Sequence, residues 1–169
     1  MAGKLVQVAT ETVTSAVASV TLTGIDSDDV YMVAVSNYIP VNNDDSAYMR
    51  ITKSGTADST SNYDRAYKDL KAYTTFANNS SANEDKINFG NVGTAGSEGV
   101  NSIIHLYNFN SSSEYSFGTQ EDTTLNSAQQ HRGQQGGFVH TVASASDGLF
   151  FYMASGNIAS GTFTLYRVV

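Results

Sequence analysis

Three histidines and two acidic clusters are the side chains in this sequence whose types could support catalysis or metal binding. The histidines are His105, His131 and His140, and their spacing matches neither HxH nor HxxxH. His105 and His140 each stand in an apolar run, so we expect both to be sheet residues with internal hydrogen bonds. The patterns HExxH, GxGxxG and GxSxG and the P-loop are also missing from the sequence. We therefore predict no catalytic residues, no cofactor and no enzymatic activity.

The acidic clusters are "DSDD" at residues 26–29 and "NNDD" at residues 42–45. Calcium binds several oxygen ligands, and two loops at one end of a β-sandwich could supply them. Asp and Asn are also frequent in turns, because their side chains form hydrogen bonds with nearby backbone groups. We favour solvated turns, predict no metal site, and keep calcium as the alternative.

Length and composition indicate a single domain over residues 1–169 with its own apolar core. The chain has no cysteine, so it contains no disulfide or thiolate metal site. Its net charge of −7 argues against a nucleic-acid partner, because phosphate binding needs a concentrated positive field. No apolar run is long enough to span a bilayer, and the N-terminal residues do not resemble a signal peptide. We expect neither a nucleic-acid nor a membrane partner.

Short apolar stretches separated by turn residues predict an all-β fold, namely an antiparallel β-sandwich of about ten short strands. Residues 17–24 and 46–53 alternate between apolar and polar side chains, as half-buried strands do. Residues 30–38 are apolar on both faces, which predicts a central strand. The chain ends on Val169, an apolar β-branched residue that we expect to be held in a sheet.

Two segments allow more than one interpretation, and the prediction for a third depends on a turn signal alone. Residues 63–76 fit either a helical stripe or a strand. Residues 117–137 form the longest stretch without a strand pattern, which predicts a loop that is functional or mobile, or a hairpin tip. The tight-turn signal "SDG" at 146–148 predicts a hairpin, so residues 137–169 should form a three-stranded meander.

Four patterns resemble a group of small β-sandwich virion proteins of tailed bacteriophages of the marine type. They are "VASVTLTGI" at residues 17–25, the strand at 30–37, "SNY" at 61–63 and the closing "SGNIASGTFTLY" at 155–166. Two departures are the absence of tryptophan and Arg167, which stands where glycine often follows "LY". The resemblance implies a jelly-roll-like sandwich, favours a strand at 63–76, and brings no catalytic residues with it.

The resemblance also implies a structural protein of the virion, commonly a homotrimer, whose partners are the phage capsid or other virion proteins. The first predicted strand begins at Lys4 and leaves no stalk, which favours a capsid decoration (cement) protein over a tail fibre. The alternative is a receptor-binding tail-fibre or tail-tip module whose exposed tyrosines stack on host glycans. An unrelated intracellular β-sandwich enzyme or lectin is a third interpretation, without a motif to support it.

Two segments are the predicted contacts with neighbouring proteins, chosen for expected exposure and flexibility. The first is the N-terminal segment, formed by Lys4, Leu5, Val6, Gln7 and Val8. The second is the 119–135 region, represented by Gln129, Gln130 and Arg132. Side-chain amides and one cationic anchor in that region could bind a partner by hydrogen bonds.

Overall fold

The computed structural model describes residues 3–169, which form thirteen antiparallel β-strands and no helix. The all-β sandwich predicted from the sequence is therefore confirmed, with more strands than the sequence pattern revealed. No helix in the described residues is long and apolar enough to cross a membrane. The strands are β1 (Leu5–Val13), β2 (Ser19–Thr23), β3 (Tyr31–Pro40), β4 (Asp45–Lys53), β5 (Thr56–Ala57), β6 (Tyr63–Lys71), β7 (Ala77–Glu84), β8 (Ile87–Val92), β9 (Val100–Tyr107), β10 (Ser116–Leu125), β11 (His131–His140), β12 (Gly148–Met153) and β13 (Ile158–Val168).

Eight of these strands are connected as a jelly roll. They pair first with last: β1 with β13, β2 with β12, β3 with β9, and β4 with β8. The rolled ribbon places β1, β13, β3 and β9 side by side in one sheet and β2, β12, β4 and β8 in the other. Consecutive strands of the roll thus alternate between sheets and enclose the core, as in other jelly rolls.

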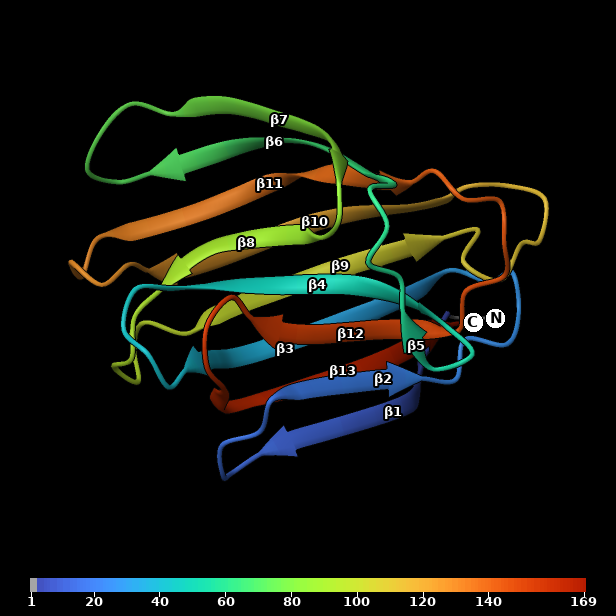
Figure 1. Ribbon diagram of the computed structural model, residues 1–169, viewed down its shortest axis with the longest axis horizontal. Helices are drawn as coiled ribbons and strands as arrows, with labels where there is room; N and C mark the ends of the chain where they lie inside the picture. Colours follow the sequence, from blue (N-terminus) through green and yellow to red (C-terminus); the bar gives the residue numbers. More distant parts are fainter. Residues whose placement is uncertain (1–2) are drawn as a thin grey trace.

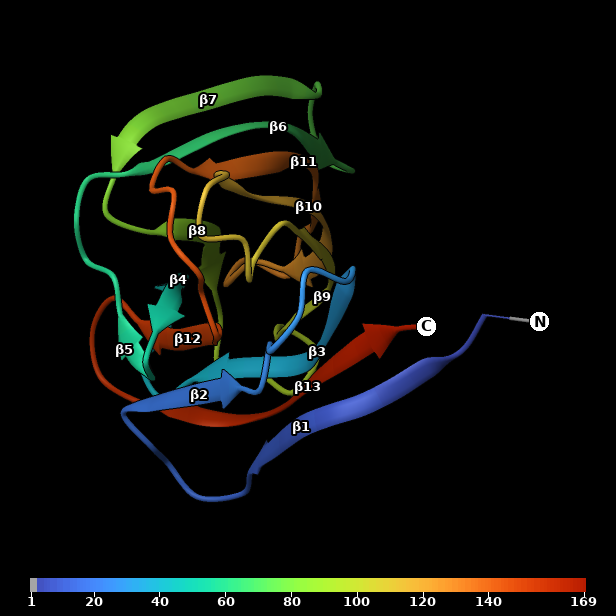
Figure 2. The ribbon, with the colours of Figure 1, turned by 90° about the vertical axis from the view of Figure 1, so that its right-hand side faces the viewer.

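The remaining strands extend the two sheets. The larger sheet continues past β9 through β10, β11, β6 and β7, which gives it eight strands, and β5 adds to the smaller sheet. Figure 2 shows the larger sheet curving around the smaller one, which lies on its concave side. The convex side of the larger sheet is the surface that positions the candidate site described below.

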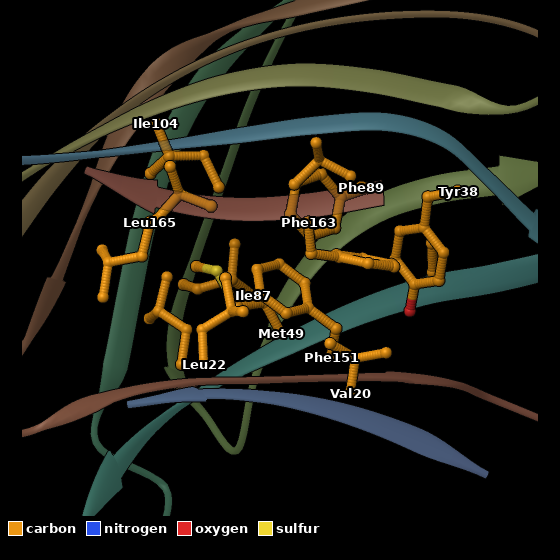
Figure 3. Close-up of a cluster of buried hydrophobic side chains, with 14 of the residues drawn as sticks. Val20, Leu22, Tyr38, Met49, Ile87, Phe89, Ile104, Phe151, Phe163 and Leu165 are labelled. Atoms are coloured by element: carbon orange, nitrogen blue, oxygen red, sulfur yellow. The ribbon is translucent and has the colours of Figure 1, made fainter. Parts of the chain in front are cut away.

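An aromatic cluster joins the two sheets in the core (Figure 3). Tyr38 of β3 meets Phe163 of β13 with ring centroids 5.1 Å apart, and Phe163 lies 5.0 Å from Phe151 of β12. The buried Tyr38 hydroxyl donates a hydrogen bond to the carbonyl of Tyr152 at 2.6 Å. Burial raises the pKa of Tyr38 well above its usual range, so it stays a neutral donor.

Several strand predictions are confirmed. β3 lies inside the larger sheet between β13 and β9, where a strand that is apolar on both faces was expected. Residues 63–71 are a strand, so the helical interpretation of 63–76 is wrong. Val169 is held at the sheet edge, because its backbone exchanges two hydrogen bonds with Lys4.

Two predictions about chain connectivity are wrong. β11 belongs to the larger sheet, whereas β12 lies in the smaller sheet between β2 and β4, so residues 137–169 do not form a meander. The segment with "SDG" crosses between the sheets and does not close a hairpin. The reason is that consecutive strands of a jelly roll alternate between sheets, which local turn signals do not reveal.

The prediction of a functional or mobile loop at 117–137 is also wrong, whereas the alternative of a hairpin tip agrees with the structure. Residues 116–125 and 131–140 form the paired strands β10 and β11, and residues 126–130 are the connecting turn, hereafter the hairpin tip. The strands escaped detection because their inward side chains are mostly polar. Gln120, Asp122, Thr124 and Gln134 occupy positions where a sandwich strand usually carries apolar residues.

Candidate functional site

The convex side of the larger sheet carries a broad surface, which we name the outer face. It consists of the side chains that point away from the core on six adjacent strands. They are Leu5, Gln7, Thr10 and Thr12 of β1, and every second residue over 162–168 of β13, 32–36 of β3, 101–107 of β9, 117–125 of β10 and 131–139 of β11. The smaller sheet packs against the opposite side (Figures 1 and 2).

The outer face is almost free of charge. Within these described strand residues, Glu121 is its only Asp, Glu, Lys or Arg side chain. The Glu121 carboxylate accepts a hydrogen bond from the amide of Gln135 at 2.7 Å, within the same face. Depletion of charge with aromatic enrichment is typical of the centre of protein–protein interfaces.

Large apolar side chains lie exposed on this face. Ile103 is 39% exposed, Tyr107 36% and Phe117 45%, and Leu5 and Val168 at the far strands are also exposed. Tyr107 and Phe117 are register partners on β9 and β10, so their side chains are neighbours on the outer face. Exposed apolar side chains gathered on one face, as at Tyr107 and Phe117, are typical of a binding surface.

A shallow groove of about 480 Å³ runs across one end of the outer face. Tyr107, Phe117 and Val139 line its apolar part, and Asp64 and Ser81 of β6 and β7 add polar groups. Gly137 leaves space for the groove because it has no side chain to fill it. Such a groove can accept an apolar side chain or the ring of a sugar.

A second arrangement brings together Ser, His and Asp side chains near the other side of the larger sheet. Nε2 of His140 lies 2.9 Å from Oδ2 of Asp58, and Ser116 is the register partner of His140. Burial lowers the pKa of His140, so the ring is neutral at pH 7. Ser116 and His140 are both almost completely buried, so a substrate cannot reach the serine hydroxyl.

The acidic turns do not converge on a common cation site. Residues 26–29 precede β3 and residues 42–45 follow it, so the ten-residue strand separates them by roughly 30 Å. Arg167 forms an ion pair with Asp29 at 2.5 Å, and the backbone amides of Ser46 and Ser155 donate to Asp45. Among the described residues no group of three or more His, Asp or Glu side chains could hold a metal ion.

The predicted N-terminal contact residues are part of an ordered strand. Leu5, Val6 and Gln7 pair with Val168, Arg167 and Tyr166 of β13, and Val8 packs against the core. Lys4, Leu5, Val6 and Gln7 keep exposed side chains. β1 is an edge strand, so its outer backbone edge is free to meet another chain.

The predicted contacts around the hairpin tip have internal partners. Gln129 donates a hydrogen bond to the buried carboxylate of Glu98, and Gln130 pairs with Asn126. Arg132 is half-buried in an ion pair with Asp69, at 2.9 Å, so it does not serve as an exposed anchor. The tip, between β10 and β11, also lies at the opposite end of the sheet from the start of β1, as Figure 1 shows, so the two predicted segments do not form one surface.

Asp69 is the centre of a buried polar network on the concave side of β10, β11 and β6. Its Oδ1 accepts hydrogen bonds from Arg132 at 3.0 Å and from Gln134 at 3.1 Å. Its Oδ2 accepts one from Asn79 at 3.0 Å. The Arg65 guanidinium donates a hydrogen bond to the side-chain oxygen of Gln134. The network satisfies polar groups that would otherwise be costly to bury, so it acts as a polar part of the core.

The buried carboxylate of Asp122, in the same network, should make the stability of the protein depend on pH. Burial raises its pKa to about 6, although Gln120 and Gln134 donate hydrogen bonds to its carboxylate. The folded state therefore binds more protons than the unfolded state between about pH 4 and 6, and this group's contribution to stability falls as pH rises through that window. The total loss is at most about 3 kcal/mol.

Replacement Asp122→Asn is expected to remove this dependence. Urea unfolding at pH 4.5 and pH 7.5 would show the variant gaining stability relative to the wild type at the higher pH. Glu121→Gln removes the same charge from an exposed neighbouring position and is the control. Equal shifts of the two variants with pH would contradict the assignment to Asp122.

The outer face cannot be recognised from the sequence alone. Its residues come from six strands distributed along the whole chain, and only the jelly-roll pairing brings them together. A usable signal was present in β9, where Ile103 and Tyr107 occupy outward positions that a solvated strand would fill with charged residues. No protein-family model, curated protein sequence or solved structure gives a significant match to this chain.

Proposed function

We propose that this chain is a non-enzymatic structural protein of a bacteriophage virion, a capsid decoration protein that acts as a homotrimer on the outside of the particle. The observation that carries the proposal is the outer face, an exposed sheet surface with a single charged side chain. A surface of this kind suits permanent contact between proteins. Jelly rolls are frequent among viral capsid proteins, which agrees with the resemblance carried by the sequence motifs.

The closing motif of that resemblance has a clear role in the fold. Residues 155–166 form the turn that leads into β13 and most of that strand, which lies between β1 and β3. Gly156 and Gly161 both adopt positive φ angles, a backbone conformation that favours glycine. The motif therefore supports a shared fold more directly than a shared binding partner.

The exposed edge of β1 is the part of the chain that we assign to the capsid. Val6 is 40% exposed there, and the strand presents unpaired backbone groups to a neighbouring subunit. Many weak contacts of this type hold a decoration protein in place, because a trimer presents three copies of the edge at once. The hairpin tip is a less favourable candidate, since Gln129 is already bonded to Glu98.

Co-sedimentation with capsids purified without this protein tests the proposal. Saturable binding at many copies per particle is expected for a decoration protein. Val6→Glu should weaken that binding at least tenfold, because it buries a carboxylate in the contact, whereas Val41→Glu is a control at an exposed apolar residue outside β1. Absence of saturable binding by the wild-type protein would contradict the proposal.

The alternative, a tail-tip module that binds host glycans, is favoured by one observation, the groove beside Tyr107 and Phe117. Stacking of a sugar ring on Phe117 would be lost in Phe117→Ala. Binding to host cells at few copies, abolished by that substitution, would move the protein from the capsid to the tail. Unchanged cell binding by Phe117→Ala would rule out the groove as the glycan site.

A further inference from the structure

The distribution of charge separates the outer face from the rest of the molecule. The chain carries 16 acidic and 9 basic residues, a net charge of −7, so two copies repel each other over most of their surface. The outer face is the exception, because Glu121 is its only charged side chain among the described strand residues and is bonded to Gln135. Two copies can therefore approach through this face without like-charge repulsion.

The size of the face is adequate for a stable contact. Six strands spaced about 4.8 Å apart, each about eight residues long on this face at a rise of about 3.3 Å per residue, cover roughly 750 Å². A standard specific interface buries roughly 800 Å² per partner. The outer face alone thus approaches the area that a stable association requires.

The shape of the face suits a second sheet of the same kind. Threonine, alanine and glycine are common on it, as at Thr164, Ala34 and Gly137. These small residues leave recesses between the larger side chains. Ile103 and Phe117 project from β9 and β10 as exposed apolar groups. Sheets with such surfaces pack face to face about 10 Å apart, with projecting side chains filling the low regions of the partner.

We infer that the outer face is the surface on which copies of this chain pack against one another. A foreign partner of opposite charge would be attracted by the carboxylates, which lie elsewhere on the molecule. Two copies of this chain carry the same negative charge, so they can meet only through a surface that is nearly free of charged side chains. The inference rests on the proposed role of the outer face in protein contact and assigns that face to a second copy, which leaves the edge of β1 for the capsid.

Sedimentation velocity of the wild-type protein and of Ile103→Glu tests the inference. The wild type is expected as an oligomer at two or three times 18.0 kDa, and the variant at 18.0 kDa, so that the oligomer is lost. Val41→Glu changes an exposed apolar residue at the turn after β3 and should keep the wild-type mass. Urea unfolding of each variant shows whether the fold is retained, and Thr119→Glu, on the same face, replaces Ile103→Glu if it is not.

A wild-type protein that sediments at 18.0 kDa would overturn the inference, as would an oligomer that folded outer-face variants leave intact. Capsid co-sedimentation of the same samples keeps the two proposals apart. An oligomer broken by Ile103→Glu that does not bind capsids supports self-association and contradicts the decoration role. A monomer that binds capsids contradicts self-association and supports the decoration role.

Discussion

Replacement of Asp69 by alanine is expected to destabilise the protein by about 3 kcal/mol, because it removes the buried anion that pairs with the half-buried Arg132 guanidinium. Asp69 is 4% exposed and accepts hydrogen bonds from Arg132, Gln134 and Asn79. Urea denaturation followed by circular dichroism measures the loss. The measured loss is the contribution of Asp69 to the polar part of the core that joins β6 to β11.

A double-mutant cycle distinguishes this ion pair from simple packing. Arg132→Leu in the Asp69→Ala background removes the uncompensated charge, so the double variant should be more stable than Asp69→Ala alone. Asp64→Ala, on the same strand but facing outward, is the matched control and should cost about 1 kcal/mol or less. Additive losses at Asp69 and Arg132 would show that the two side chains do not interact energetically.

Replacement of Phe151 by alanine is the second large effect, with an expected loss of about 3 to 5 kcal/mol. Phe151 is completely buried, and its ring lies 5.0 Å from Phe163 and 6.3 Å from Tyr38, so truncation opens a cavity where the two sheets meet. Phe150→Ala is the matched control, because the ring of Phe150 points to the other side of β12 and is partly exposed. Equal losses for the two variants would contradict the assignment of the aromatic cluster as the core contact between sheets.

The sequence predicted the strands whose inward residues are apolar. β2 and β4 alternate as expected, with Val20, Leu22 and Met49 buried, and the apolar β3 lies inside its sheet. β7 was missed because its sequence, "ANNSSANE", contains no large apolar residue, as an edge strand that is largely exposed can. Most of β10 and β11 was missed because several of their buried residues are polar, among them Gln120, Thr124 and Gln134.

Chain order was predicted less well than strand positions. Turn signals are local, whereas the pairing of β1 with β13 joins residues about 150 positions apart and depends on the whole core. The same limit applies to the candidate site. Gln129 and Arg132 were chosen because the sequence around them looks flexible, yet both bind buried carboxylates, and the outer face emerges only when the strands are placed side by side.

Hydroxyl-radical footprinting of the purified protein at its working concentration tests most directly whether the outer face is a protein interface. The aromatic side chains of Tyr107 and Phe117 on the outer face and of Tyr73 and Phe76 on the β6–β7 connection are all exposed in a single copy. We expect Tyr107 and Phe117 to be protected from oxidation in the assembled protein and to become reactive in Ile103→Glu, while Tyr73 and Phe76 react equally in both. Tyr107 and Phe117 reacting as fully as Tyr73 and Phe76 in the wild-type protein, alone and on capsids, would contradict the account.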